Sequence, residues 1–190
     1  MKSQTKLTTK KIVLVALMAA LTVLGSSLRI TVPVDLVGTS SFHLGNIMCA
    51  LSGLLLGPWF GGLAAGLGSA IYDMLNPLYI SECWITFILK GAYGLVAGLI
   101  AFRGSNKLGY GKALCASAAA AVTYGILYLA KGCFYDGLLI KGLSFSVALG
   151  AVLATKIPAT IFNAAVAIIA APILSLAIRT ALHKSRIDLD

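Results

Sequence analysis

Three lysines of this sequence lie in or beside long apolar segments, where a charged side chain is costly. Lys90 stands inside the apolar segment 84–102, roughly 9 Å from its start at about 1.5 Å per helical residue. Lys131 and Lys156 lie near one end of two later apolar segments. A lysine in such surroundings usually pairs with a polar partner or meets a ligand. The three amines therefore predict a polar site on one side of the molecule.

Aromatic and amide side chains accompany two of these lysines at helical spacing. Tyr124, Tyr128 and Lys131 are separated by four and three residues, which places them on one face of a helix. Asn163 follows Lys156 by seven residues and shares a helix face with it. The tyrosines predict an aromatic wall with a cation at its end. Asn163 is equally consistent with a hydrogen bond to a neighbouring helix.

Glu82 and Trp84 come just before the position of Lys90 in the same region of the chain. Each can contribute to a binding site, and each also has a simpler interpretation. Trp84 is placed where tryptophan anchors a helix at the membrane surface. Glu82 lies about two helical turns before Lys90, within reach of a salt bridge. We include both in one predicted substrate site, which consists of Glu82, Trp84, Lys90, Tyr124, Tyr128, Lys131, Lys156 and Asn163.

The elements that position these residues must lie in a bilayer. Of the 190 residues, 59% are hydrophobic and only 11% are charged, and the mean hydropathy is +0.95. In soluble domains about a quarter of the residues are charged. The composition of this chain therefore excludes a soluble enzyme, a disordered chain and a collagen-like fibre. We predict a single all-α membrane domain over residues 1–190.

Six apolar segments are candidates for membrane-spanning helices, since about 20 helical residues cross a hydrocarbon core. They are 11–28, 43–57, 58–75, 84–102, 113–135 and 158–179. The Gly57-Pro58 step divides one apolar stretch into two short helices joined by a tight turn. Alternating apolar residues predict an extended or hairpin-like flap in the loop 29–42.

The apolar stretch 143–182 is interrupted by Lys156 and Pro158. Proline lacks a backbone donor and is favoured in the first turn of a helix. We therefore place the start of the sixth helix at Pro158 and expect 136–157 to be a partly helical loop at the membrane surface.

The basic residues predict which side of the membrane each loop occupies. Ten of the fifteen lie on the same side as the N-terminus, four lie on the other side, and Lys90 lies within a span. Because cytoplasmic loops are enriched in Lys and Arg, both termini are predicted to be cytoplasmic, in a six-helix bundle of the cell membrane. This asymmetry accounts for the net charge of +9 without a nucleic-acid partner.

The sequence contains none of the common motifs for nucleotide hydrolysis or nucleophilic catalysis. Its Gly111-Lys112 pair has Asn106 where a phosphate-binding loop requires glycine. Neither H-E-x-x-H nor G-x-S-x-G occurs, and His43 and His183 fall on opposite sides of the predicted membrane. We predict no enzymatic activity, no cofactor and no metal site.

Three stretches of the chain carry a family resemblance. They are ALMAALTVLG with Ala16 and Ala20, FHLGNIMCALSGLLLGPWFGGLAAGLGSAIYDML at 42–75, and ITFILKGAYGLVAGLIA at 85–101. With the six short spans, they resemble the substrate-binding S-components of energy-coupling factor (ECF) vitamin transporters. The resemblance implies a vitamin-like ligand at the outer half and a complex with a transmembrane coupling protein and two cytoplasmic ATPases. It further implies that Ala16 and Ala20 contact the coupling protein and that loop 29–42 gates the pocket.

Two classes of ligand stay open at this point. The three lysines and Glu82 favour an anionic group, such as the carboxylate of pantothenate. Tyr124, Tyr128 and Trp84 suit a flat ring, as in riboflavin, pyridoxine, hydroxymethylpyrimidine or a queuosine precursor.

Two other functions compete with a binding subunit. An autonomous small-solute carrier or channel requires a continuous polar path, but the inner halves of the predicted spans carry almost no charged residues. A scaffold that docks only through its small residues requires no pocket. The lysines and tyrosines gathered in the outer half favour the binding subunit.

Overall fold

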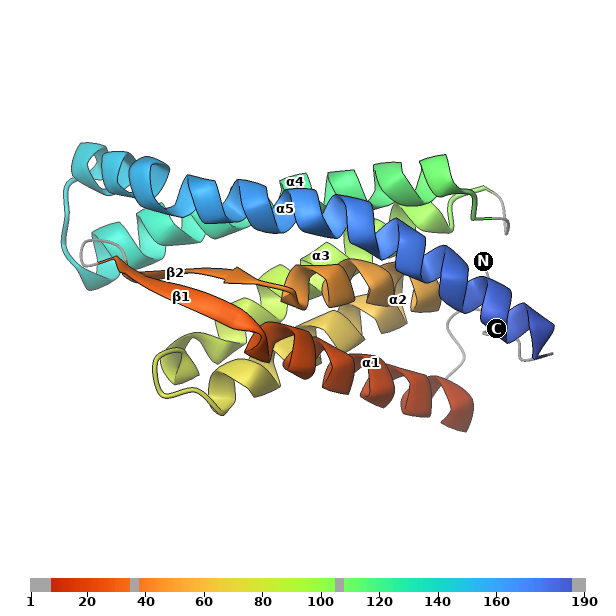
Figure 1. The fold of residues 1–190 in the computed structure, drawn as a ribbon. Helices are drawn as coiled ribbons and strands as arrows, with labels where there is room; N and C mark the ends of the chain where they lie inside the picture. The colour runs from red at the N-terminus through yellow and green to blue at the C-terminus, as the bar shows by residue number, and fades with distance from the viewer. Residues whose placement is uncertain (1–7, 35–37, 105–107, 186–190) are drawn as a thin grey trace.

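The computed structural model describes residues 8–34, 38–104 and 108–185, which form a bundle of long helices with one β-hairpin (Figure 1). Its elements are α1 (Thr9–Ser27), β1 (Arg29–Val34), β2 (Gly38–His43), α2 (Gly45–Met74), η1 (Ile80–Glu82), α3 (Cys83–Ala101), α4 (Tyr110–Lys131), η2 (Gly132–Ile140) and α5 (Phe145–Lys184). Within this described part of the chain, five helical segments are long and apolar enough to cross a membrane. The predicted all-α membrane protein is confirmed, and its orientation in the membrane stays a prediction.

α2 consists of two antiparallel halves that meet at Gly57. Gly57 has a φ of 80° and a ψ of −175°, a conformation that is essentially restricted to glycine. Pro58 then opens the second half, where its missing N–H costs no hydrogen bond. A side chain on Gly61 would collide with the backbone of Gly53 and Ser52, so the two halves lie in direct contact. The break predicted at this step is present, and the number of six spans stays a prediction.

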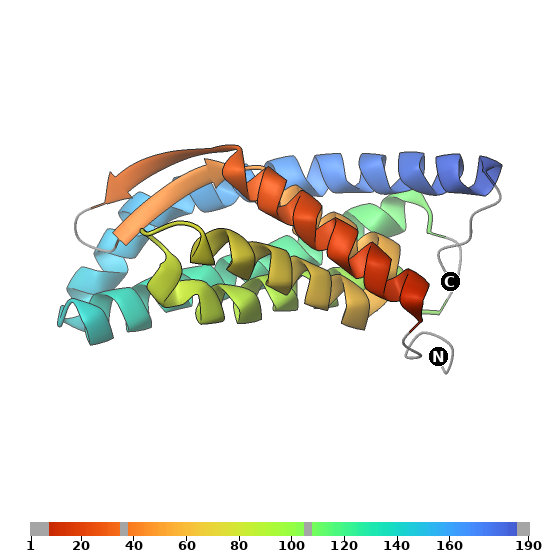
Figure 2. The ribbon, with the colours of Figure 1, turned by 90° about the horizontal axis from the view of Figure 1, so that it is seen from below.

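β1 and β2 pair in antiparallel register and connect α1 to α2. The extended, hairpin-like conformation predicted for 29–42 is therefore observed, although residues 35–37 lie outside the described part of the chain. Phe42 of β2 packs edge-on against Phe162 of α5, with ring centroids 5.3 Å apart. Figure 2 shows the hairpin lying along the first part of α5.

The prediction of a surface loop over 136–157 is wrong. η2 is a π-helix that continues α4, and α5 begins at Phe145 and runs for 40 residues through both Lys156 and Pro158. A membrane helix tolerates proline when neighbouring groups satisfy the freed backbone carbonyl. Lys156 is only 1% exposed and pairs with a carboxylate inside the protein, within a continuous helix. Neither residue ends a helix here.

The bundle has two unlike halves. The start of α1 and the end of α5 lie at one end, and the hairpin lies at the other (Figure 1); we call these the packed half and the hairpin half. Alanines of α3, α4 and α5 fill the core toward the packed half, with Ala97, Ala101, Ala113, Ala116, Ala167 and Ala171 all buried. A side chain on Gly98 would collide with the backbone of Gly57 and Pro58, so α3 packs tightly on the turn of α2. Such close approach of backbones replaces the hydrophobic effect as the packing force in lipid.

Candidate functional site

A cavity of about 200 Å³ lies in the hairpin half. The hairpin and every long helix contribute to its wall. Its charged lining residues are Arg29, Asp73, Glu82, Lys90, Lys131, Asp136 and Lys156. Its aromatic and amide lining residues are Asn46, Tyr72, Tyr79, Tyr124, Tyr128 and Asn163. A cavity in which a few polar groups converge is the usual form of a small-molecule site.

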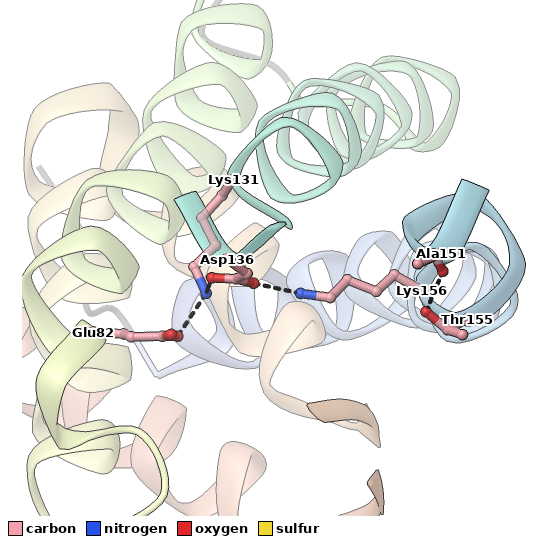
Figure 3. A network of polar contacts seen from close by, with 6 residues as sticks. All are labelled: Glu82, Lys131, Asp136, Ala151, Thr155 and Lys156. Atoms are coloured by element: carbon pink, nitrogen blue, oxygen red, sulfur yellow. Dashed lines mark hydrogen bonds and ion pairs between the residues drawn. The ribbon is translucent and has the colours of Figure 1, made fainter. Parts of the chain in front are cut away.

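A chain of ion pairs runs along the cavity wall from η1 to α5 (Figure 3). Lys131 Nζ lies 2.6 Å from Glu82 Oε2 and 2.7 Å from Asp136 Oδ1. Lys156 Nζ lies 2.7 Å from the other carboxylate oxygen, Asp136 Oδ2. Asp136 is placed between the two lysines by the π-helix η2, so this local irregularity joins α4 to α5. Two of the three predicted amines are thus balanced by carboxylates.

Lys90 occupies a different environment on the α2 side of the cavity. Its Nζ donates a hydrogen bond to Asn46 Oδ1 and lies 4.1 Å from the ring centroid of Tyr124. Its side chain is only 5% exposed. Asn46 follows the hairpin directly, in the first turn of α2. Lys90 therefore ties the middle of α3 to the base of the hairpin.

Tyr124 and Tyr128 form the predicted aromatic wall on α4. Their rings are stacked, with centroids 5.8 Å apart and planes 16° from parallel. Lys156 Nζ lies 5.0 Å from the centroid of Tyr128, so each ring faces a buried cation. Cations over ring faces are stabilised by the negative potential of the π system.

Asn163 of α5 holds the hairpin through both atoms of its amide. Its Oδ1 accepts a hydrogen bond from the backbone N–H of His43 at 2.9 Å, and its Nδ2 donates to the carbonyl of Ser41 at 2.7 Å. Ser41 Oγ also lies 3.3 Å from the hydroxyl of Tyr79. Asn163 thus fixes β2 over the cavity while it lines the cavity itself, and its contact with a ligand stays a prediction.

Arg29 holds the other strand of the hairpin. Its guanidinium carbon lies 4.1 Å from the ring centroid of Tyr72 and 4.9 Å from that of Tyr79. Its Nε donates to the carbonyl of Ser26 at the end of α1, at 2.9 Å. The hairpin is therefore attached to α1, α2 and α5 by side chains that also line the cavity.

His43 lies at the end of β2, outside the candidate spans. Loss of hydration in the cavity wall lowers the pKa of His43 well below its usual 6.5, and the charges of Lys90 and Arg29 lower it further. The imidazole is consequently neutral at physiological pH. Its Nδ1 accepts a hydrogen bond from the backbone N–H of Gly45 at 3.1 Å, as only an unprotonated nitrogen can.

The cavity brings together seven of the eight residues predicted for the site. Those seven are Glu82, Lys90, Tyr124, Tyr128, Lys131, Lys156 and Asn163. Trp84 is the exception: it is 56% exposed outside the cavity and packs edge-on against Tyr135, with centroids 6.2 Å apart. The helix turns Trp84 away from the face that carries Lys90, which fits an anchor at the membrane surface. Glu82 pairs with Lys131 and not with Lys90.

Several lining residues were not predicted. Asp73 lies within the apolar segment of α2 and accepts a hydrogen bond from the Thr86 side chain. An acidic residue inside such a segment is itself a signal for function and could have identified it. Asp136 carried no comparable signal, because it falls where a surface loop was expected. Arg29 and Asn46 flank the hairpin, and only its fold over the cavity brings them into the wall.

The predicted docking residues Ala16 and Ala20 are both exposed on α1. Val13, Leu17 and Leu24 are exposed beside them, so the outer face of α1 is smooth and apolar. Among the described residues, no group of three or more His, Cys, Asp or Glu side chains is placed to hold a metal ion.

Comparison with known proteins identifies one family. The family model described as "ECF-type riboflavin transporter, S component" matches residues 6–180. A curated protein of Pyrococcus woesei named "Uncharacterized protein in gap 3'region" is 34% identical over 95 residues, which are 50% of this chain and 59% of that protein. The match therefore spans less than two thirds of the relative's length.

Proposed function

Because the chain belongs to the ECF-type riboflavin transporter S component family, we propose that its cavity binds a flat-ringed vitamin, with riboflavin as the first candidate. In this proposal the hairpin half faces the outside of the cell, and the hairpin gates the cavity. The chain is then the substrate-binding subunit of an importer and performs no chemistry on its ligand.

One observation carries the proposal: a hairpin is fastened over a cavity that holds a stacked pair of tyrosines. The rings of Tyr124 and Tyr128 offer π faces to a planar ligand, and Lys90 and Asn46 offer a donor and an amide beside them. Flat heterocycles need this combination of ring faces and a few directed hydrogen bonds.

A pantothenate-like anion receives less support than the sequence suggested. The prediction rested on three lysines and Glu82, but Lys131 and Lys156 both pair with Asp136. A carboxylate ligand would have to compete with Glu82 and Asp136 for these amines. A neutral ring with hydroxyl groups requires no such exchange.

The energy for release comes from partners in this proposal. A transmembrane coupling protein and two cytoplasmic ATPases supply it, and the apolar face of α1 with Ala16 and Ala20 is the docking surface. Support comes from the exposure of both alanines and from the absence of a phosphate-binding motif in the sequence.

An autonomous carrier or channel is the alternative, and it receives no support from the packed half. Backbone contacts of Gly98 and Gly94 with α2, together with buried alanines, pack this half tightly. A carrier would need a continuous polar path through this packing or a large rearrangement of α2 against α3.

Ligand binding tests the proposal directly. Detergent-purified protein should quench riboflavin fluorescence on binding, with one ligand per chain and without ATP. A panel of pantothenate, pyridoxine and hydroxymethylpyrimidine should bind more weakly. If no vitamin in the panel binds, the chain is not a binding subunit of the proposed kind.

Docking is tested by separating binding from uptake. Ala20→Trp should leave riboflavin affinity unchanged and abolish uptake in cells that contain the complete transporter. Ala165→Trp is the matched control, since Ala165 is an exposed alanine on α5. Loss of riboflavin binding in Ala20→Trp would instead assign Ala20 to internal packing.

A further inference from the structure

A second hollow of the molecule is an open groove in the packed half, where the end of α5 lies beside the start of α4 (Figure 1). The described residues that line it are Leu108, Leu176, Arg179, Thr180, His183 and Lys184. The last five belong to α5 and are related by spacings of three and four residues, so they form one stripe along the helix. The stripe begins with an apolar side chain and ends with a cation. A membrane helix passes from hydrocarbon to lipid headgroups in this order.

Arg179 is held beside this groove by the break in α2. Because Pro58 has no N–H, it cannot donate the helical hydrogen bond to the carbonyl of Leu54, four residues earlier. Arg179 Nη2 donates to this carbonyl at 2.7 Å, and the guanidinium carbon lies 5.4 Å from the ring centroid of Phe102. A guanidinium carries five N–H groups and a permanent charge. Arg179 can therefore hold α2 and still contribute a fixed positive charge to the groove.

The described carboxylates lie in the other half of the bundle. Asp73, Glu82 and Asp136 are the only acidic side chains among the residues that the structure describes, and all three line the cavity of the hairpin half. The groove instead combines Arg179 and Lys184 with apolar side chains. The helix dipole favours a cation in the last turn of α5, which accounts for Lys184 but not for the arginine earlier in the helix. An anion with an apolar part is the complementary occupant.

From this groove we propose that the packed half binds an anionic phospholipid, whose phosphate lies between Arg179 and Lys184. Both side chains recognise phosphate through their charge and their N–H donors. His183 adds an imidazole N–H within the same stripe. Leu108 and Leu176 adjoin the apolar part of the lipid, which a soluble phosphate lacks. This site is separate from the vitamin cavity and does not depend on the ligand bound there.

The test measures binding of dioleoylphosphatidylglycerol, dioleoylphosphatidylcholine and inorganic phosphate to the purified full chain in detergent. Native mass spectrometry counts the lipids held by each chain and gives the two dissociation constants. Both lipids contain a phosphate, but only phosphatidylglycerol has a net negative charge. The wild type should hold one phosphatidylglycerol molecule about tenfold more tightly than phosphatidylcholine. Inorganic phosphate at the same concentration should not displace the lipid.

Two variants change the groove in different ways. Lys184→Glu reverses a charge at the exposed end of α5, and Thr180→Glu adds a carboxylate between the two cations without removing either. Each should lower the affinity for phosphatidylglycerol by about tenfold. Because both residues are exposed, each variant should keep the monomer peak of the wild type in size-exclusion chromatography.

Two matched controls separate the groove from a general effect of charge. Lys141→Glu makes the same charge change at an exposed position in the hairpin half, and Lys10→Glu makes it at the packed end outside the groove. Each should change the affinity for phosphatidylglycerol by less than about threefold, because salt screens exposed charges at such distances. Replacing Asp188 and Asp190 by asparagine should likewise leave the affinity unchanged.

Each contrary outcome overturns the lipid site and names another occupant. Equal binding of the two lipids, or an unchanged preference in Lys184→Glu and Thr180→Glu, would show that the groove does not recognise an anionic lipid. An equal loss in Lys10→Glu would indicate a diffuse basic surface, and displacement by inorganic phosphate would indicate a site for soluble anions. A tenfold gain on replacing Asp188 and Asp190 would assign the groove to the chain's own carboxylates. All of these outcomes leave the proposed vitamin site untouched, since no vitamin enters the test.

Discussion

The hairpin half and the packed half of this bundle differ in the residues that they bury within the bilayer. The hairpin half gathers seven charged side chains, His43 and several tyrosines around a cavity. The packed half buries alanine and glycine, and its helices approach until their backbones touch. The large polar cavity and its buried charges thus lie at one end, while close backbone packing dominates the other.

This difference shows how one chain can hold a polar site in a bilayer without creating a leak. Polar groups in lipid must find partners within the protein, so they cluster where several elements converge. Small residues need no partners and permit the closest packing. The boundary between the halves lies near Lys90 and Tyr124, where polar groups adjoin the alanine core.

The largest effect is expected from breaking the packed half. Gly98→Leu places a side chain against the backbone of Gly57 and Pro58 and should cost about 3 kcal/mol or more of stability. The loss of stability is measured by heating the protein and following the decrease of its monomer peak in size-exclusion chromatography. Gly150→Leu is the control, because no atom lies near a side chain at Gly150. Equal stability of the two variants would contradict the close packing described here.

Removing the central cation should affect binding more than folding. Lys90→Met keeps the apolar stem but loses the hydrogen bond to Asn46 and the contact with Tyr124. In the proposed complex Lys90 also donates a hydrogen bond to the ligand, and such a bond from a charged donor contributes about 2 kcal/mol, so riboflavin affinity should fall by about thirtyfold. Titration calorimetry measures the change. Lys141→Met, at an exposed position outside the cavity, should leave affinity unaltered; a similar loss in both variants would argue against a specific site.

A smaller and kinetic effect is expected at the hairpin. Asn163→Ala removes two hydrogen bonds to the backbone of β2, at 2.9 and 2.7 Å. With about 1 kcal/mol lost, ligand dissociation should accelerate by about fivefold while association changes little. Stopped-flow fluorescence separates the two rates. An unchanged dissociation rate would show that Asn163 does not hold the hairpin closed.

The smallest effect is expected at Trp84. Because Trp84 lies outside the cavity, Trp84→Ala should change riboflavin affinity by less than about twofold. Fluorescence titration of the variant beside Lys90→Met gives the comparison. A tenfold loss of riboflavin affinity would show that Trp84 belongs to the ligand site and that this site extends beyond the cavity described here.

Much of this architecture could be predicted from local signals. The Gly57-Pro58 step indicated the turn within α2, and alternating residues indicated the hairpin. Helical spacing placed Tyr124, Tyr128 and Lys131 on one face, and the structure finds all three in the cavity wall. Such signals work because turn conformations and helix periodicity depend on neighbours in the sequence.

Other features were beyond local signals. Pro158 is a common start of a helix, yet α5 passes through it, as a membrane helix can when neighbouring groups satisfy the freed carbonyl. Glu82 pairs with Lys131, which lies 49 positions later in the chain. The spacing in the sequence had suggested Lys90 as the partner of Glu82. Asp136 was missed because its role depends on a π-helix that points it between two lysines.

The sequence by itself determined that this chain is a membrane protein, that a break falls at Gly57-Pro58 and that the lysines in apolar segments need partners. These properties depend on the composition of the chain or on a few neighbouring residues, so they can be predicted without knowledge of the fold. The tertiary structure alone decided which charges neutralise one another, which amide holds the hairpin and which tryptophan faces away. Those choices depend on the rotation and separation of helices packed side by side, and an error of one residue in register would give each side chain a different partner.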